Sequence, residues 1–247
     1  MAITLSKSAL EKYRTCPRCF WLEKREGLKQ PEGIRSGLPM GMDRVIKNHY
    51  DAWRAQGELP PEIREALPGW KLYDGKRMSL SDMRNWRKGL AVDLGEGITL
   101  SGALDDLLYH PERKVYAMLD YKTKAKATNE ADTRKYYGLQ AEVYDGNLDK
   151  NGYPTEGNAI FVYYYPVDFP DNYPMTVPTA GNTIMGWGVQ PIWLTGVDRE
   201  APRKLAREAA AMLEKDAPPA AGQACNVCNY IKERSSLGAR FKAAAGA

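Results

Sequence analysis

Apolar residues recur every three to four positions in several stretches of the chain, a pattern typical of helices with one buried face. An N-terminal helix is predicted to begin after Ser6 or Ser8, where Glu11 completes a capping box, and to be interrupted at Pro17. Gly- and Pro-rich residues 30–39 predict a loop. The further helices predicted are 42–56, a short one near 61–66, a short one after Ser79, 132–147 and the Ala-, Glu- and Arg-rich 199–215.

In the middle of the chain the apolar pattern becomes that of strands. The runs 98–109 and 114–121 are joined by 110–113, which predicts a hairpin. The apolar run 158–165 predicts a buried strand, and a further strand is expected over 185–194. Strands and helices that alternate in this way predict an α/β fold.

Composition adds limits to this picture. With 247 residues, 43% hydrophobic and 27% charged, we expect one domain over 1–247, with 57–90 as a helical lobe. The sequence has no apolar run of membrane-spanning length and no leader-like start, so we expect a cytoplasmic protein without membrane contact. A net charge of +4 and a pI near 8.7 permit a polyanionic partner without requiring one.

The four cysteines fall into two C-x-x-C pairs, Cys16 with Cys19 and Cys225 with Cys228. A two-residue gap makes a poor disulfide but lets both sulfurs bind one metal, and paired thiols in a reducing compartment indicate metal ligands. We therefore predict that the two ends of the chain meet at a structural four-thiolate site. Four thiolates suit zinc or an iron–sulfur cluster.

Charged residues interrupt the predicted hairpin. Asp105 lies toward the end of its first strand, and Asp120 and Lys122 share one face of the returning strand because side chains alternate along a strand. Charges among apolar strand residues need a partner or a metal, and two carboxylates suit magnesium or manganese. An ammonium beside them can orient or deprotonate a water and stabilise charge in phosphoryl transfer. A structural salt bridge is the alternative interpretation of any one of these residues taken alone.

Gln140 and Tyr144 lie four residues apart on a predicted helix and so share a face. With them, three motifs stand in order: G-A-L-D (102–105), D-Y-K (120–122) and Q-A-E-V-Y (140–144). Together these motifs resemble the PD-(D/E)XK nuclease superfamily, in particular its RecB-like branch with the CRISPR-associated exonucleases. The opening S-K-S-A-L-E-K-Y-R-T-C-P-R-C-F is also similar to the start of many such proteins.

The resemblance implies a restriction-endonuclease-like fold, with a mixed central sheet flanked by helices. It also implies a Mg or Mn ion held by Asp105, Asp120 and the backbone carbonyl of Tyr121, with Lys122 at the attacking water. Family members often add a histidine from a preceding helix. His49 is our candidate for this ligand, although the family commonly places the histidine nearer to Asp43 in this numbering.

The resemblance favours a 4Fe-4S cluster at the cysteines, with zinc as the alternative. Related nucleases with such a cluster usually supply one cysteine from the front and three from the back. Here Arg234 stands about where the last would fall, and Cys19 is expected to supply the fourth thiolate instead.

Two functions follow as expectations. The first is a Mg- or Mn-dependent deoxyribonuclease, an exonuclease on single strands or DNA ends, with partners in recombination, DNA repair, phage or CRISPR machinery. The second is a nucleic-acid-binding or assembly subunit with a nuclease fold and little activity. A purely structural zinc protein would explain the thiols but leave Asp105, Asp120 and Lys122 without a role.

Overall fold

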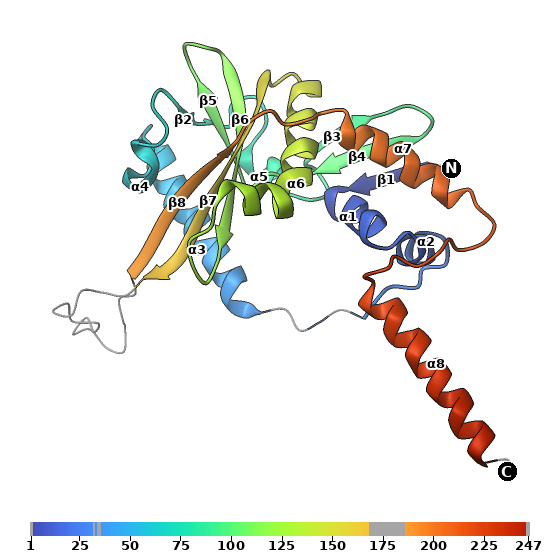
Figure 1. The fold of residues 1–247 in the computed structure, drawn as a ribbon. Coiled ribbons are helices and arrows are strands. Elements are labelled where there is room, and N and C mark those ends of the chain that lie inside the picture. Colours follow the sequence, from blue (N-terminus) through green and yellow to red (C-terminus); the bar gives the residue numbers. More distant parts are fainter. Residues whose placement is uncertain (1, 32, 34–35, 168–185, 246–247) are drawn as a thin grey trace. The chain divides into compact units, whose positions relative to one another are not determined.

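The computed structural model describes residues 2–31, 33, 36–167 and 186–245, with side chains as far as Leu237 (Figure 1). The elements in chain order are β1 (Ile3–Ser6), α1 (Lys7–Thr15), α2 (Pro17–Arg25), α3 (Gly37–Ala55), α4 (Pro61–Arg64), β2 (Lys71–Leu72), α5 (Leu80–Met83), β3 (Leu90–Asp93), β4 (Ile98–Gly102), β5 (Asp106–His110), β6 (Val115–Thr123), α6 (Glu130–Lys150), β7 (Thr155–Val167), β8 (Gly186–Leu194), α7 (Ala201–Leu213) and α8 (Asn226–Ala245).

The N-terminal helix is interrupted where the sequence predicts. Cys16 is extended (φ −155°, ψ 98°), so it ends α1 and also serves as the N-cap of α2, in which Pro17 takes the first position. The helix α3 begins before the expected residue 42, within the segment expected to be a loop. Pro39 fits the first turn of α3 because the missing N–H has no partner there in any helix.

The larger sheet is mixed, as expected. Its order is β2-β5-β6-β7-β8, and all neighbours are antiparallel except β6 and β7, which are parallel. A parallel pair needs a crossover, and α6 lies in that connection. The hairpin of β5 and β6 agrees with the prediction, with Asp106 opposite Leu119 and His110 opposite Val115.

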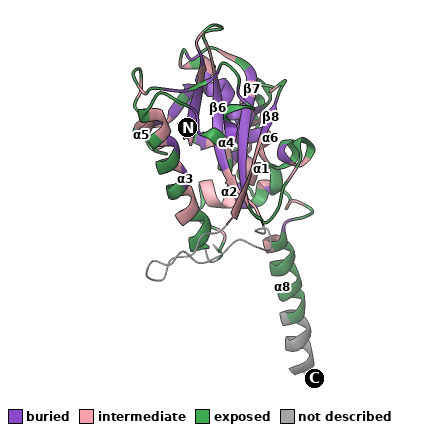
Figure 2. Cartoon of the chain, turned by 90° about the vertical axis from the view of Figure 1, so that its left-hand side faces the viewer, coloured by how far each residue is buried: buried purple, intermediate pink, exposed green. Residues whose placement is uncertain are grey.

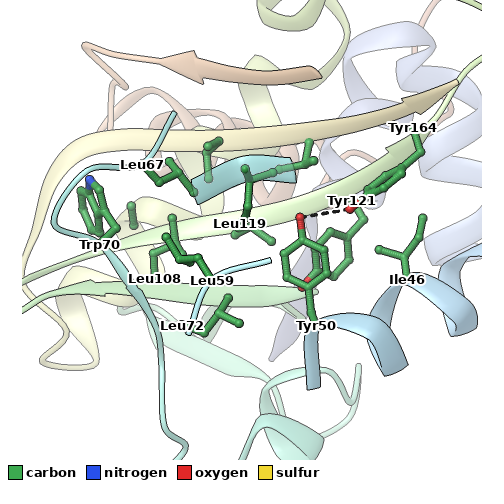
Figure 3. Close-up of a cluster of buried hydrophobic side chains, with 14 residues drawn as sticks. Ile46, Tyr50, Leu59, Leu67, Trp70, Leu72, Leu108, Leu119, Tyr121 and Tyr164 are labelled. Carbon is green, nitrogen blue, oxygen red and sulfur yellow. Dashed lines mark hydrogen bonds between the residues drawn. The ribbon is translucent and has the colours of Figure 1, made fainter. Parts of the chain in front are cut away.

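Side-chain alternation along these strands builds a core on each face of the sheet. On one face, Leu108, Leu119 and Ile160 pack with α3 and α4, where Tyr50 is completely buried (Figure 3). A hydrogen bond from the Tyr164 hydroxyl to the Tyr50 hydroxyl (3.2 Å) satisfies polar atoms within this layer.

The opposite face of the sheet carries the alternate residues. Leu107, Met118 and Phe161 pack with Ala141 and Leu148 of α6. The central strands β6 and β7 are therefore buried over most of their length (Figure 2). The large sheet lies between α3 and α4 on one face and α6 on the other, and this arrangement positions the polar side chains described below.

The predicted strand 98–109 is broken, and this corrects the sequence analysis. Ala103–Asp105 are not in a strand, because the Leu104 amide donates to the Met83 carbonyl (3.0 Å) instead of continuing the ladder. The first half of the run becomes β4, in a small sheet of order β1-β4-β3, and the second half becomes β5. Asp105 therefore lies in a bend immediately before β5.

The chain forms two compact units. One comprises residues 1–34, 93–100 and 202–247, and the other comprises residues 35–92 and 101–201. The first contains the four cysteines and the second contains the large sheet. Among the described helices, none combines the length and hydrophobicity that a membrane crossing requires.

Candidate functional site

Asp105 is held in place by α5 and by its own backbone. The Arg84 guanidinium donates from Nε to the Asp105 carbonyl (2.8 Å), which fixes the bend. The Asp105 side chain keeps 24% of its surface exposed, and its Oδ2 accepts a hydrogen bond from the Tyr121 amide (3.4 Å). This contact places the Asp105 carboxylate beside the middle of the D-Y-K motif.

The next residue, Asp106, has a different environment. It is completely buried, and its Oδ2 accepts from Arg54 Nη2 (2.5 Å), from Arg84 Nη2 (3.2 Å) and from the Tyr121 hydroxyl. Two guanidinium groups therefore neutralise a carboxylate that has no access to solvent. Of the two consecutive aspartates, only Asp105 keeps a solvent-accessible carboxylate.

The strand β6 carries Asp120 and Lys122 on one face, opposite Phe161 and Tyr163 of β7. The two side chains form an ion pair, with Asp120 only 2% exposed. Burial by itself would lower the pKa of Lys122, but the negative charges of Asp120 and Asp105 outweigh it and raise the pKa.

The helix α6 completes the group of polar side chains on β6. Its N-cap is Asn129, whose side chain accepts from the Asp132 amide (2.8 Å). Gln140 lies on the buried side of this helix. Its Nε2 donates to Asp120, and its Oε1 accepts from Lys122 Nζ (3.4 Å). Gln140 therefore bridges the acid and the amine and fixes the orientation of both.

Tyr144 has a packing contact that explains the glycine of the first motif. A Cβ atom at Gly102 would lie 2.5 Å from Cε1 of the Tyr144 ring, so only glycine fits against this ring. The first and third motifs thus meet through a direct ring-to-backbone contact.

His49 and Lys47 face different partners on α3. His49 Nε2 pairs with Glu62 Oε1 (2.8 Å), and Glu62 also accepts from the Tyr164 hydroxyl (3.1 Å). Lys47 instead pairs with Asp105 Oδ1 (2.9 Å). Two residues along a helix turn the side chain by roughly 200°. The structure brings together Asp105, Asp120, Lys122, Gln140 and the Tyr121 backbone, and it gives His49 a partner outside that group.

The four cysteines gather in the other unit, as the sequence predicts. Their sulfur atoms all lie within 4.8 Å of one another, and three of the Sγ–Sγ separations are 3.8 Å (Cys16–Cys228), 3.6 Å (Cys19–Cys225) and 3.4 Å (Cys19–Cys228). We call these four residues the cysteine cluster. The thiols are free, and the cluster is compatible with a metal site.

Backbone contacts hold the cysteine cluster together. Gly222 donates its N–H to Cys16 Sγ (3.3 Å), and a Cβ there would lie 2.0 Å from the Thr15 carbonyl, so glycine is required. Burial by itself would raise the pKa of Cys16, but hydrogen bonds from the Gly222 and Cys19 amides outweigh it and lower the pKa to about 7. Burial raises the pKa of Cys19 and Cys228 instead, so the amide donors single out Cys16 as the thiol that ionises most readily.

Hydrogen bonds also fasten α2 to the segment that follows α7. Trp21 Nε1 donates to the Lys215 carbonyl (3.1 Å), Arg25 Nη1 to the Leu213 carbonyl (2.5 Å) and Arg18 Nε to the Pro219 carbonyl (2.8 Å). Contacts besides the thiols therefore join the N-terminal and C-terminal regions.

The model of the PD-(D/E)XK nuclease superfamily matches residues 45–232, more than half of the chain and all three motifs. The chain belongs to the PD-(D/E)XK nuclease superfamily. No curated protein matches the sequence.

The side chains of this nuclease fold suit a hard divalent cation of the kind that PD-(D/E)XK nucleases typically use, Mg or Mn. Asp105 and Asp120 offer carboxylate oxygens, the ligands that such ions prefer. Each carboxylate also contacts an ammonium group, Lys47 at Asp105 and Lys122 at Asp120. Both carboxylates thus already bind a cationic group of the chain, which shows that each one lies where a positive charge is favourable.

Two features of this candidate site were not predicted from the sequence. One is the buried Asp106 with its two arginines, for which no local pattern gives a signal because Arg54 and Arg84 come from distant segments. The other is Lys47, which follows Asp43 by four residues on α3, a spacing that predicts a helical ion pair. That spacing could have drawn attention to this part of α3.

Proposed function

We propose that this PD-(D/E)XK protein is a Mg- or Mn-dependent deoxyribonuclease that acts as an exonuclease on single strands or DNA ends. The observation that carries this proposal is the contact of Gln140 with both Asp120 and Lys122, beside the Tyr121 amide that donates to Asp105. These contacts join the three motifs into one group of hydrogen-bonded side chains. A hydrolytic site needs such a group to be in place before the substrate binds.

In this proposal Asp105, Asp120 and the Tyr121 carbonyl hold the metal ion. The ion supplies activation of a water and polarisation of the phosphate when it is bound. Lys122 keeps its positive charge at neutral pH in the metal-free protein, because Asp120 and Asp105 raise its pKa. We therefore assign Lys122 the tasks of orienting the attacking water and stabilising the negative charge that grows on the phosphate.

Gln140 and Tyr144 have positioning roles in this scheme. Gln140 limits the directions in which Asp120 and Lys122 can point, because it bonds to both. Tyr144 sets the approach of α6 to Gly102, three residues before Asp105. These contacts support the orientation of the reactive groups without placing either residue on the phosphate.

The test is cleavage of end-labelled DNA with Mg²⁺ or Mn²⁺ and with chelator. Linear single strands, linear duplexes, circular single strands and RNA are compared. The proposal expects metal-dependent loss of linear DNA, with circular DNA spared. Cutting of circular DNA would show an endonuclease, and no cutting of any substrate would contradict the proposed activity.

A second function is favoured by the pairing of His49 with Glu62, which leaves the site without a nearby histidine. In this alternative the protein binds nucleic acid or assembles with other proteins and cleaves weakly. Salt-sensitive binding to DNA in chelator, together with no turnover in Mg²⁺ or Mn²⁺, would favour it.

We further propose that the cysteine cluster holds a single zinc ion. Zinc lies about 2.3 Å from each thiolate in a tetrahedron, which separates the sulfurs by roughly 3.8 Å. Three of the sulfur separations, 3.4–3.8 Å, lie near this value, and all four sulfurs lie within 4.8 Å of one another. In a 4Fe-4S cluster each thiolate binds a different iron, which spreads the sulfurs further apart.

The metal content of an anaerobic preparation tests the zinc proposal. One zinc per chain in a colourless protein supports it. A brown protein with iron, sulfide and absorption in the blue would establish the iron–sulfur cluster that the family resemblance favours.

A further inference from the structure

Lys47 lies between two carboxylates. Its Nζ is 2.9 Å from Asp105 Oδ1 and 2.9 Å from Oδ2 of Asp43, which is one turn earlier on α3. The Lys47 side chain is 22% exposed and that of Asp43 is 44% exposed. The ammonium group therefore occupies the solvent-accessible side of the carboxylate that we propose as a metal ligand.

Both oxygens of Asp105 are engaged in this arrangement. Oδ2 accepts from the Tyr121 amide and Oδ1 pairs with Lys47. A divalent ion that binds Oδ1 comes close to the Lys47 ammonium, and because the two cations repel each other, the Lys47 contact opposes binding of the ion.

Asp43 provides an alternative partner for the Lys47 ammonium. Lysine carries its charge on a flexible four-carbon stem, and the carboxylate of Asp43 lies on the same helix at the i,i+4 spacing. When the Asp105 contact is lost, the Asp43 contact can keep the ammonium paired.

The second lysine of the site differs in this respect. Lys122 is held by Asp120 and Gln140, and its Nζ lies over the rings of Tyr137 (4.7 Å) and Phe161 (5.8 Å). Lys122 therefore has an amide and two rings beside it as well as a carboxylate, whereas the contacts described for Lys47 are the two carboxylates.

We propose that Lys47 is a resident counter-ion that competes with the divalent ion for Asp105 and is retained by Asp43 when the ion binds. The inference rests on the proposed function, since it takes Asp105 as a metal ligand. It goes further in assigning Lys47 and Asp43 the task of setting how tightly the metal binds.

Opposite effects are expected for the two partners. Without the Lys47 charge, the metal ion meets an unoccupied carboxylate oxygen and binds more tightly. Without the Asp43 charge, Lys47 is left with Asp105 as its carboxylate partner, so the metal ion binds less tightly. The effect of Asp43 should be smaller when Lys47 has already been replaced, because part of it acts through that lysine.

The experiment measures Mn²⁺ affinity of the full chain without DNA, by electron paramagnetic resonance of free Mn²⁺. Lys47→Met is expected to tighten binding about tenfold or more, the effect of removing a unit charge near a divalent ion even in a water-like dielectric. Asp43→Asn is expected to weaken it about threefold or more. In the Lys47→Met background Asp43→Asn should weaken it by a smaller factor than in the wild type, and equal factors in the two backgrounds would contradict a role that runs through Lys47.

The matched control is Lys76→Met, which removes the same charge from a surface pair with Asp74 in the same unit. It should leave Mn²⁺ affinity unchanged. Lys47→Gln is measured in parallel, with thermal melting of every variant, so that the test survives if one variant fails to fold. Equal or weaker Mn²⁺ binding in both Lys47 variants overturns the inference.

Asp105→Asn separates this outcome from failure of the proposed function. If wild-type Mn²⁺ binding is lost in Asp105→Asn but unaffected by Lys47, the metal site stands and the competition is wrong. If Mn²⁺ binding does not depend on Asp105, both the metal site and the role of Lys47 are overturned.

Discussion

The two candidate sites of this protein balance charge in different ways. At the carboxylate site, Asp105 and Asp120 contact Lys47 and Lys122, and the neighbouring Asp106 contacts two arginines. At the cysteine cluster, four thiols contact one another and accept hydrogen bonds from backbone amides such as that of Gly222. The chain's own cations stabilise the first site, whereas thiolates in the second need a bound cation.

The difference has a consequence for stability. Removing a divalent ion from the carboxylates leaves charges that lysines can still pair. Removing a metal from the cysteine cluster leaves sulfurs at close range, with burial opposing the ionisation of Cys19 and Cys228. Metal should therefore serve catalysis at one site and folding at the other.

The largest effect is expected from replacing Cys225 and Cys228 together by serine. Loss of two thiolates should remove the bound metal and cost about 5 kcal/mol or more in the free energy of unfolding, part of the ~10–16 kcal/mol that structural zinc supplies in small peptides. Denaturant unfolding and metal content measure the two changes. Exchange into buffer free of Mg²⁺ and Mn²⁺, without chelator, is the control and should leave the unfolding midpoint unchanged.

If the double variant and the wild type unfold at the same denaturant midpoint, the metal at the cysteine cluster does not stabilise the fold, and the proposed difference between the two sites is wrong. The hydrogen bonds of Trp21, Arg25 and Arg18 would then suffice to join the two ends.

The next effect is on cleavage. Asp120→Asn keeps the shape of the side chain beside Gln140 and Lys122 but removes the charge, so metal binding and water activation should fail. We expect the cleavage rate to fall about 10³-fold or more, equivalent to about 4 kcal/mol of transition-state stabilisation. Single-turnover digestion of labelled DNA measures the rate, and near-ultraviolet circular dichroism verifies the fold.

Lys76→Ala is the matched surface control and should cleave at the wild-type rate. Full activity in the Asp120→Asn protein would move the catalytic centre away from β6.

A smaller effect is expected from the buried charges beside the site. Arg54→Met leaves Asp106 with one guanidinium in place of two, and Asp106 is completely buried. Breaking such a pair should cost about 3 kcal/mol in the free energy of unfolding. Arg64→Met, which breaks an exposed pair with Glu58, is the control and should cost less than about 1 kcal/mol.

Equal losses in the two arginine variants, measured by urea unfolding, would mean that Asp106 is stabilised mainly by Arg84 and Tyr121. Arg54 would then contribute little to the structural charge pairing of Asp106, and the contrast with the catalytic carboxylates would depend on Arg84 and Tyr121.

Local patterns predicted much of this molecule. Alternation placed Asp120 and Lys122 on one face of β6, and helical spacing placed Gln140 and Tyr144 on one face of α6, because both periods follow from backbone geometry. The pairing of the two C-x-x-C motifs was also predictable, since a metal explains two-residue gaps better than disulfides do.

Long-range polar pairing was not predictable in the same way. The break at Ala103–Asp105 depends on a hydrogen bond from Leu104 to Met83, and the burial of Asp106 depends on arginines from α3 and from the end of α5. Periodicity carries no information on such contacts. The motif resemblance singled out Asp105, but periodicity alone did not show that Asp106 is buried while Asp105 stays accessible.

The smallest effect is expected at His49, which the sequence suggested as a metal ligand. Its ring pairs with Glu62 rather than with the carboxylate site, so His49→Gln should cleave DNA within about threefold of the wild-type rate. Glu62→Gln is the matched variant, since it weakens the same pair from the other side. A loss above tenfold in His49→Gln alone would show that the histidine reaches the metal during turnover. Because the Glu62 pair would have to open for this, Glu62→Gln would then be expected to raise Mn²⁺ affinity, and the same resonance measurement would detect it.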